Sequence, residues 1–214
     1  LSFLHLVAHT PDIWPRLRPY RREIEPLMAL LDEHVEELFF EPPDPEVDHV
    51  AFEEFLGELK TALVLQAWIE EAPEDTIMGR FEVQPGDLYR LVDNARWLLY
   101  ATRELTPFFG RAELAPRLTI LMERVRHGVK EELLPLVALR GVGRVRARYL
   151  YSAGFKTIED LRRAPVRELV QVPQIGPRLA LSIKEQVGGE VSEEELEEIR
   201  AREQVQKSLL EYAR

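Results

Sequence analysis

The feature that most constrains this chain is a short unit that occurs twice in its second half. Residues 139–147 read LRGVGRVRA, and residues 172–180, thirty-three positions later, read VPQIGPRLA. In each copy an apolar run ends in a tight turn with a central aliphatic residue and a glycine, and a new helix begins at once. Because glycine tolerates positive φ and close backbone approach, we expect Gly141, Gly143 and Gly176 to permit such turns. The pattern predicts two helical hairpins.

Each predicted hairpin would present the start of a helix to its surroundings. The first amides of a helix have no intrahelical acceptor and lie at the positive end of the helix dipole, which suits a phosphate oxygen. Such contacts position a nucleic-acid backbone without reading its bases. The candidate DNA-binding residues of the two turns are Gly141, Val142, Gly143, Arg144, Arg146, Arg148, Ile175, Gly176 and Arg178.

These residues resemble the helix-hairpin-helix family of nucleic-acid-binding motifs in its tandem form. The first copy has the full glycine-aliphatic-glycine core at residues 141–143. The second copy departs from it, because Gln174 replaces the first glycine and Pro177 removes one amide donor, although proline suits the first turn of a helix. Hairpins of this type can also brace a domain without touching nucleic acid, so both interpretations stay open.

Charge is divided unevenly along the 214 residues, whose net charge is −10. Residues 1–85 carry 6 basic and 19 acidic side chains, whereas residues 86–186 carry 18 basic and 11 acidic ones. Residues 187–214 are acidic again, with 4 basic and 8 acidic side chains. Local potential governs phosphate binding more than net charge does. Residues 86–186 are therefore the candidate nucleic-acid footprint.

Composition and local pattern exclude several classes of protein. The absence of cysteine excludes disulfides and thiolate metal sites. The longest apolar stretch, residues 61–69, is too short to span a bilayer, and the N-terminus lacks a signal-peptide pattern. We expect a monomeric cytoplasmic, nucleoid-associated protein with no membrane partner, cut from a longer chain because it begins inside an apolar run at Leu1. His5 and His9 have metal-ligand spacing without a third ligand, so we expect no metal site and interpret them as core or surface histidines.

Apolar residues recur at helical spacing along most of the chain, and no convincing strand pattern occurs. The spacing predicts an all-α fold, with a helical bundle at residues 1–128 and a tandem helix-hairpin-helix domain at residues 129–190. An acidic helix is expected at residues 191–214, opened by a capping box at Ser192 and Glu195. In the bundle, helices are expected at residues 1–9, 23–40, 47–71, 85–104 and 113–126.

The expected helix at residues 85–104 carries a candidate single-strand site. Arg90, Asn94 and Trp97 are spaced i, i+4 and i+7, so they share one face. A guanidinium and an indole at this spacing can engage successive unpaired bases, and each base-aromatic stack is worth roughly 1–3 kcal/mol. The alternative is that Trp97 packs in the bundle core, as we expect of Trp68.

Several stretches resemble the C-terminal half of archaeal Ski2-like superfamily 2 DNA-repair helicases, relatives of the HelQ helicases of animals. The matching residues are LHLV at 4–7, TPD at 10–12, KTAL at 60–63, AWIEE at 67–71, PGDL at 85–88 and ARWLLY at 95–100. The resemblance covers nearly the whole chain up to about residue 187. It implies a helical ratchet domain followed by a helix-hairpin-helix domain, and it assigns a base-stacking role to Arg90 and Trp97.

The resemblance also implies a parent protein whose motor domains use ATP and Mg²⁺ to move 3′ to 5′ along single-stranded DNA and to unwind forks. This chain has no GxxxxGK[ST] phosphate loop, so we expect it to have no catalytic residues and no cofactor of its own. The expected partners are single-stranded or forked DNA and the motor domains of the parent chain. Two other functions stay open: a protein-interaction or autoregulatory module, and an accessory domain of the RNA-helicase type.

Overall fold

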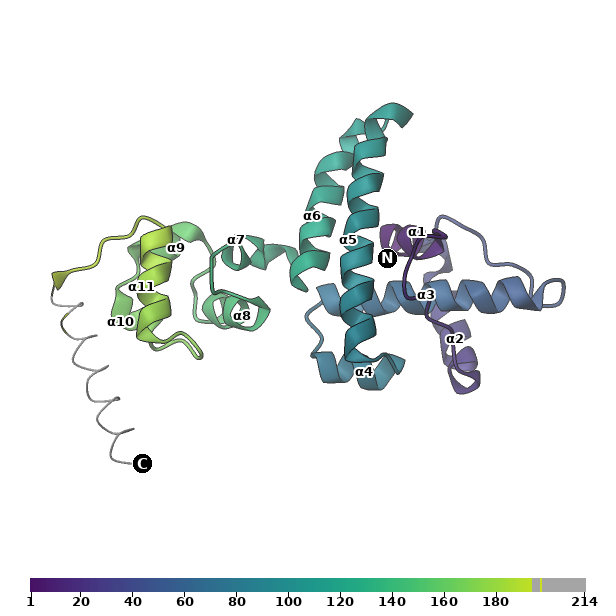
Figure 1. Ribbon diagram of the computed structural model, residues 1–214, viewed down its shortest axis with the longest axis horizontal. Coiled ribbons are helices and arrows are strands. Elements are labelled where there is room, and N and C mark those ends of the chain that lie inside the picture. The colour runs from purple at the N-terminus through teal and green to yellow at the C-terminus, as the bar shows by residue number, and fades with distance from the viewer. Residues whose placement is uncertain (194–196, 198–214) are drawn as a thin grey trace. The chain divides into compact units, whose positions relative to one another are not determined.

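The computed structural model describes residues 1–193 and residue 197 of the chain. Within these residues every regular element is helical, which confirms the expected all-α fold (Figure 1). The chain divides into two compact units, residues 1–131 and a unit that begins at Glu132. None of the described helices combines the length and the apolar character needed to cross a membrane. The acidic helix expected at residues 191–214 lies almost entirely outside the described residues.

The first unit consists of helices joined by loops and short 3-10 turns. Its helices are α1 (Ser2–His9), α2 (Ile24–His34), α3 (His49–Ile69), α4 (Glu74–Phe81), α5 (Pro85–Leu105) and α6 (Ala115–His127). Its 3-10 turns are η1 (Arg21–Glu23), η2 (Val35–Glu37), η3 (Thr106–Phe109) and η4 (Ala112–Leu114). The helices expected from the sequence are confirmed within a few residues at most of their ends.

The helix expected at residues 23–40 is shorter than its periodicity predicts, because α2 ends at His34 and η2 ends at Glu37. The following residues pack through aromatic contacts instead. The ring of Phe39 meets that of Phe3 edge-on with centroids 5.4 Å apart, and the ring of Phe40 stacks on His9 at 4.1 Å. Tertiary contacts to α1 therefore override the helical pattern at this end.

Helix α3 forms the centre of the first unit. It begins after Asp48, whose carboxylate accepts a hydrogen bond from the Ala51 amide at 3.0 Å. It ends before Glu71, which adopts a left-handed φ of 68°. Leu56 and Leu59 of this helix are fully buried, and α3 packs against α1, α2, α4 and α6. A helix that is apolar on most sides has to lie inside a bundle in this way.

Trp68 lies in the core, as expected. Its indole Nε1 donates to the carbonyl oxygen of Val125 at 2.8 Å and so joins α3 to α6. Gly128, with φ of 63°, directly follows α6 and lies against this indole, because a Cβ there would collide with the ring of Trp68. The close approach and the left-handed turn both require glycine at this position.

Helix α5 packs along α6 and also contacts α1. Pro85 occupies its first turn and Asp87 adds a carboxylate there, and both residue types favour the start of a helix. Leu91 and Leu99 are fully buried on the packed side. The rest of the α5 surface is available for contacts outside the bundle.

The second unit is smaller and begins within η5 (Glu131–Leu133). Its helices are α7 (Leu134–Val137), α8 (Arg144–Ser152), α9 (Ile158–Arg163), α10 (Val166–Leu169) and α11 (Pro177–Gln186). Its core consists of fully buried aliphatic side chains: Leu133, Leu136, Leu150, Leu161, Val166, Leu169 and Ile183. Helices α8 and α11 are the second helices of the two predicted hairpins, so each turn directly precedes a helix N-terminus.

Candidate nucleic-acid interface

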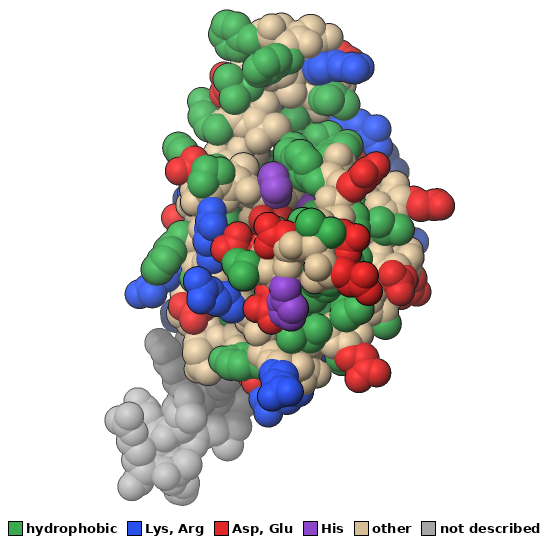
Figure 2. All heavy atoms as spheres, turned by 90° about the vertical axis from the view of Figure 1, so that its right-hand side faces the viewer, with side chains coloured by type: hydrophobic (Ala, Val, Ile, Leu, Met, Phe, Trp, Pro, Cys, Tyr) green, Lys and Arg blue, Asp and Glu red, His purple; other side chains and the backbone are tan. Residues whose placement is uncertain are grey.

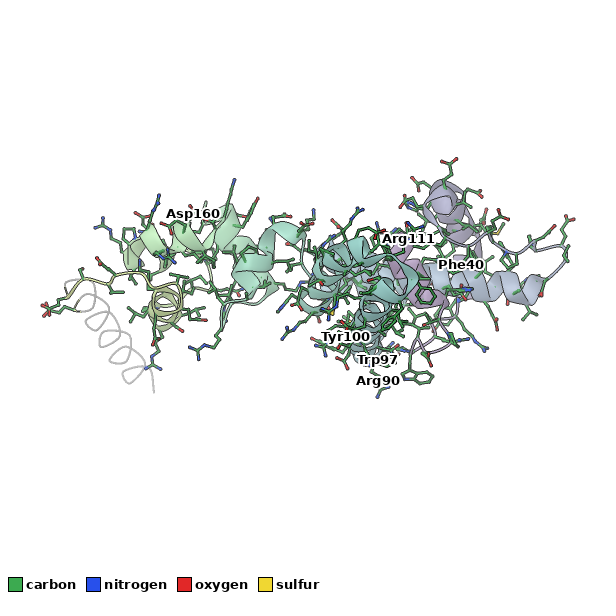
Figure 3. The ribbon with its side chains drawn as sticks, turned by 90° about the horizontal axis from the view of Figure 1, so that it is seen from above. Phe40, Arg90, Trp97, Tyr100, Arg111 and Asp160 are labelled. Atoms are coloured by element: carbon green, nitrogen blue, oxygen red, sulfur yellow. The ribbon has the colours of Figure 1, made fainter. Side chains whose placement is uncertain are left out.

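One face of α5 carries a large exposed aromatic side chain beside an exposed arginine. Trp97 is 57% exposed, although apolar neighbours such as Leu98 and Leu99 are buried. The side chain of Arg90, two turns earlier, is 68% exposed. Figure 3 shows Arg90 and Trp97 on the same side of the helix, together with Tyr100. The structure therefore places Trp97 outside the bundle core.

Asn94, predicted to share this site, has a structural partner. Its side-chain Oδ1 accepts a hydrogen bond from the backbone amide of Trp14 at 2.7 Å. The bond holds the linker after α1 against the face of α5 that carries Arg90 and Trp97. Trp14 is itself 63% exposed. The sequence did not predict a role for Trp14, because no local pattern connects residues that lie 80 positions apart.

A groove of about 300 Å³ lies beside Trp97, between α5 and α6. The lining residues are Arg96, Trp97, Tyr100, Met122, Glu123 and Arg126. Tyr100 was also missed in the sequence analysis, although its position three residues after Trp97 puts it on a neighbouring part of the same helix surface. Tyr100 is 47% exposed, so the groove has an aromatic wall open to solvent.

The arginines of this region each lie near a carboxylate three residues earlier in the same helix. The nitrogen–oxygen distances are 3.9 Å for Arg90 and Asp87, 3.1 Å for Arg96 and Asp93, and 3.4 Å for Arg126 and Glu123. Exposed ion pairs of this kind contribute at most about 1 kcal/mol. Each guanidinium can therefore exchange its carboxylate for a phosphate at small cost.

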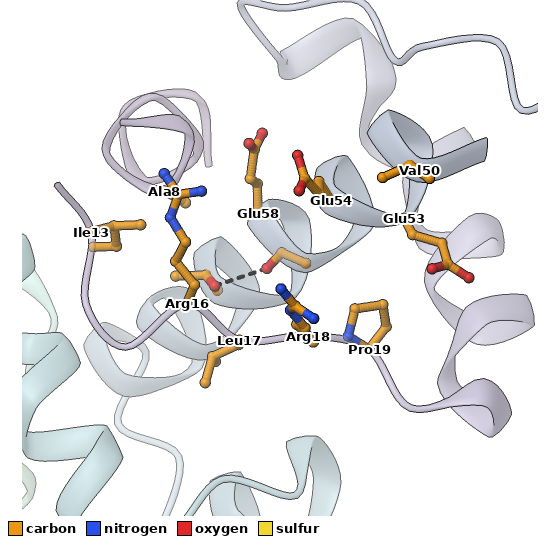
Figure 4. A pocket seen from close by; sticks show the side chains of 12 residues that line it. Ala8, Ile13, Arg16, Leu17, Arg18, Pro19, Val50, Glu53, Glu54 and Glu58 are labelled. Carbon is orange, nitrogen blue, oxygen red and sulfur yellow. Dashed lines mark hydrogen bonds between the residues drawn. The ribbon is translucent and has the colours of Figure 1, made fainter. Parts of the chain in front are cut away.

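Another part of the first unit has the opposite electrostatic character. Figure 2 shows Asp and Glu side chains gathered around the middle of the face that it presents, with several Lys and Arg side chains beside them. A cavity of about 240 Å³ over α3 has Glu53, Glu54 and Glu58 on its wall, with Arg16 and Arg18 facing them from the linker (Figure 4). Because negative charge repels a phosphate chain, α5 is the better nucleic-acid surface of this unit.

In the second unit, the two hairpin turns share one backbone conformation. Gly141 has φ of 82° and Gln174, which replaces glycine in the second copy, has φ of 62°. Gly143 and Gly176 instead adopt extended φ values of −85° and −79° as the N-cap residues of α8 and α11. The expectation that these two glycines supply positive φ is therefore wrong. The left-handed residue of each turn lies two positions earlier.

Gly143 and Gly176 have a different structural property in common. Apart from the glycine itself and its two chain neighbours, no described residue has an atom within 4 Å of the position that a Cβ would take at either glycine. Each turn thus offers open space directly at a helix N-terminus. A ligand oxygen can approach the backbone closely there, and a side chain would obstruct it.

The central aliphatic residues of the turns, Val142 and Ile175, point into the core. They are 4% and 2% exposed. Their amides donate to the carbonyl oxygens of Leu139 and Val172, each at 3.1 Å. The predicted site residues Val142 and Ile175 therefore shape the turns from inside, and neither side chain faces a ligand.

Arg146 joins the two turns. Its Nη1 donates to the carbonyl oxygen of Gly141 at 2.8 Å, and its Nε donates to the carbonyl oxygen of Gln174 at 3.1 Å. Both acceptors belong to the left-handed residues of the two copies. This predicted DNA-binding arginine thus has a bracing role that sequence spacing does not reveal.

The other hairpin arginines differ in their surroundings. The Nη2 of Arg148 donates to the carboxylate of Glu132 at 2.9 Å, and its guanidinium lies 5.1 Å from the ring centroid of Tyr151. Arg144 is partly buried at the start of α8, and Arg178 is exposed at the start of α11. The most accessible of these side chains is therefore that of Arg178.

Each of the two units matches a known protein family. Residues 1–128, more than half of the chain, match the family described as archaeal helicase, domain 4. The chain belongs to the archaeal helicase domain 4 family. Residues 133–200 match the SAM-like helix-hairpin-helix tandem family. The predicted resemblance to archaeal Ski2-like helicases with a tandem helix-hairpin-helix region is thereby confirmed.

Relatives of this archaeal helicase domain 4 chain are considerably longer than it is. It is 40% identical over 195 residues to the ATP-dependent DNA helicase Hel308 of Pyrococcus horikoshii, covering 89% of this chain and 26% of the relative. The Hel308 protein of Pyrobaculum calidifontis is 45% identical over 189 residues, covering 86% and 24%. That of Aeropyrum pernix is 41% identical over 215 residues, covering 99% and 28%. The chain spans about a quarter of the length of these curated relatives.

Proposed function

We propose that this chain is the DNA-binding module of an ATP-dependent DNA helicase, in which α5 holds single-stranded DNA and the hairpin turns hold its phosphate backbone. The observation that carries the proposal is the 57% exposure of Trp97 on the same face of α5 as Arg90. The names of the Hel308 relatives support the helicase assignment.

The spacing of Arg90 and Trp97 suits a strand that follows the helix axis. Residues seven positions apart are separated by about 10 Å along an α-helix. A strand running along α5 passes both side chains, so an unpaired base stacks on the Trp97 indole and another lies on the Arg90 guanidinium. Stacking of this kind tolerates any base, as a translocating enzyme requires.

The hairpin turns add contacts to the backbone of the strand. The open space at Gly143 and Gly176 lets a phosphate oxygen approach the N-termini of α8 and α11, where the helix dipole favours negative charge. Arg144 and Arg178 add positive charge at the same helix ends. These contacts hold DNA without regard to sequence.

In the whole protein, we propose, separate motor domains use ATP and Mg²⁺ to move 3′ to 5′ along single-stranded DNA during repair of replication forks. The module described above holds the strand that the motor moves and hydrolyses nothing itself. Its partners are single-stranded or forked DNA and those motor domains. It acts as a monomer in the cytoplasm, associated with the nucleoid.

Fluorescence anisotropy tests the α5 site. The chain is titrated against a labelled single strand, its duplex and a 3′-tailed fork over a series of salt concentrations, with a single-stranded RNA of the same sequence for comparison. The Arg90→Ala/Trp97→Ala double variant should bind the single strand at least about fivefold more weakly, since one lost base stack costs about 1–3 kcal/mol.

Matched controls separate this effect from general loss of charge or fold. Arg111, whose side chain is 70% exposed and lies apart from Arg90 in Figure 3, provides the charge control as Arg111→Ala. Tyr89, 58% exposed on α5, provides the aromatic control as Tyr89→Ala. Unchanged affinity of the double variant, or an equal loss in the controls, would refute the α5 site.

The hairpin site is tested with Gly143→Ala. Because Gly143 has an extended φ and open space around it, alanine should leave the stability of the second unit within about 0.5 kcal/mol of the original. It should nevertheless weaken DNA binding to all sequences alike, since a methyl group then stands where the phosphate approaches. A loss confined to one sequence would contradict backbone recognition.

A second candidate function, protein docking, has one specific observation in its favour. Phe108 and Phe109 in η3 are 85% and 77% exposed. Two adjacent exposed phenylalanines are unusual on a free surface and are typical of a protein contact. If Phe108→Ser/Phe109→Ser weakens association with separately produced motor domains and leaves DNA affinity unchanged, the module has this docking function as well.

A further inference from the structure

The groove between α5 and α6 adjoins the Arg90 and Trp97 face but is built largely from other residues. Arg96, Trp97 and Tyr100 line it from α5, and Met122, Glu123 and Arg126 line it from α6. Its volume of about 300 Å³ is at the lower end of the range for sites that bind small organic groups. Its occupant should therefore be small and flat.

Tyr100 forms an aromatic wall of the groove, and its ring also contacts a guanidinium group. The guanidinium carbon of Arg103 lies 4.9 Å from the centroid of the Tyr100 ring, and Arg103 is in turn bound by Glu104 at 2.6 Å. Arg103 does not line the groove. A cation on one side of the ring orders the tyrosine, so its stacking surface is prepared before a ligand arrives.

The charges around the groove match a nucleotide. The side chains of Arg96 and Arg126 are 44% and 52% exposed. Each forms an ion pair with a carboxylate, and such an exposed pair contributes little stability in water. Glu123 lies 3.4 Å from Arg126, which balances its charge, and 3.5 Å from His127, whose pKa is lowered by burial. Its carboxylate repels a phosphate but can accept a hydrogen bond from the N–H group of a base. The groove thus favours a base inside and a phosphate at its arginine rim.

We propose that this groove is a separate base-binding subsite, in which one nucleobase of single-stranded DNA stacks on Tyr100 and packs against Met122 while an adjacent phosphate binds Arg126. The inference rests on the proposed function, because it requires that α5 carries a single strand. It adds a contact from α6, so the strand is held between two helices as well as on the surface of one.

The decisive variant is Tyr100→Ala, measured by anisotropy with a labelled single-stranded oligodeoxynucleotide. It should lower affinity about five- to 150-fold, the range for loss of one base-aromatic stack. Tyr100→Phe keeps the ring and should bind within about twofold of the original. Tyr89→Ala is the matched control, since Tyr89 is also an exposed tyrosine of α5 but lies outside the groove, and it should have no effect.

The phosphate contact is tested with Arg126→Gln. Loss of one phosphate contact should reduce the slope of log affinity against log salt by about one. A probe series with a single abasic position moved along the strand provides a further readout. In the original chain the position bound in the groove should be sensitive to base removal, in addition to the positions that contact Arg90 and Trp97, and only the groove position should lose its sensitivity in Tyr100→Ala.

The outcomes distinguish the subsite from the proposed function. If Arg90→Ala/Trp97→Ala loses binding while Tyr100→Ala binds normally, the subsite is overturned and the α5 site stands. If neither variant loses binding, both proposals are overturned. If Tyr100→Ala unfolds, the test uses Arg126→Gln and the abasic series. An unchanged salt slope, with no sensitive position beyond those that contact Arg90 and Trp97, then overturns the subsite.

Discussion

The backbone amide of Trp14 donates a hydrogen bond to Oδ1 of Asn94 at 2.7 Å. This bond connects the linker after α1 to the face of α5 proposed to hold single-stranded DNA. It gives Asn94 a positioning role, since the oxygen that would otherwise accept from a base already has a partner. The exposed indole of Trp14 is held near the Arg90 and Trp97 face as a result.

Replacing Asn94 tests this role. Asn94→Ala should lower the free energy of unfolding by about 1 kcal/mol, the usual net worth of one such hydrogen bond. Asn94→Asp keeps an acceptor oxygen and should recover most of that loss in urea denaturation. If instead Asn94→Ala leaves stability unchanged and weakens single-strand binding, Asn94 contacts DNA directly.

Arg146 leads to a prediction for the second unit. Because its guanidinium bonds the carbonyl oxygens of Gly141 and Gln174, Arg146→Ala should lower the local stability of the hairpin turns by about 1–2 kcal/mol. Arg146→Lys should also destabilise them, since one ammonium group cannot reproduce the planar geometry that reaches both acceptors. Hydrogen exchange of amides in α8 and α11 measures the effect.

The matched control is Arg167→Ala, which removes an exposed arginine from α10 of the same unit. It should leave the exchange rates of α8 and α11 unchanged. Equal exchange in the Arg146 and Arg167 variants would show that the bridge between the turns does not stabilise them, and Arg146 would then be a phosphate ligand alone.

The two left-handed turn residues should respond to substitution with opposite signs. Gly141→Ala should destabilise the second unit by about 1–2 kcal/mol, because φ is 82° and the new Cβ would lie 2.8 Å from the Leu179 Cδ1 atom. Gln174→Gly should stabilise it by up to about 1 kcal/mol, because glycine adopts φ of 62° without steric cost. Thermal unfolding of the two variants provides the comparison, and a change of the same sign in both would contradict it.

The all-α fold was predictable because its signals are local. The apolar periodicity of α3 and α5 and the proline and glycine residues at their ends are properties of short segments. Where the prediction of the fold was wrong, a tertiary contact decided: Phe39 and Phe40 pack on α1, and the expected helix stops at His34. Periodicity alone cannot show which partner an aromatic ring will find.

The candidate site was predictable only in part, because the sequence shows local spacing but not tertiary contacts. The i, i+7 spacing of Arg90 and Trp97 places them on one face, and the structure agrees. Trp14 and the α6 side of the groove come from distant parts of the chain and leave no mark in a local pattern. Arg146 shows the converse case, since a basic residue in a DNA-binding motif also serves as a brace.

The two histidines of α1 have different surroundings, since one lies in the core and the other at the surface. His5 is fully buried between the rings of Phe40 and Phe55, whereas the side chain of His9 is 44% exposed and its Nδ1 lies 2.8 Å from a carboxylate oxygen of Glu58. Burial, and secondarily the charge of His9, lower the pKa of His5 to about 4. His5 is therefore neutral in the folded protein at neutral pH.

This pKa predicts that acid destabilises the first unit. The unfolded chain takes up a proton at His5 near pH 6.5, whereas the folded chain does so only near pH 4. Stability is thus unaffected above pH 6.5 and falls as the pH drops from 6.5 to 4, by up to about 3 kcal/mol from this group. The charged groups nearest to His5 are His9 and the Glu58 carboxylate, which lies 4.0 Å from Nε2 of His5.

His5→Leu should remove this contribution and flatten the dependence of unfolding free energy on pH between 6.5 and 4, measured by urea denaturation at each pH. His49, whose side chain is 70% exposed, supplies the control, and His49→Ala should keep the original dependence. The two proteins are compared by the slope of unfolding free energy against pH. This comparison remains valid even if leucine changes the stability at neutral pH. Parallel slopes in His5→Leu and the original chain would mean that other groups cause the acid sensitivity, because His5 would then bind its proton equally in both states.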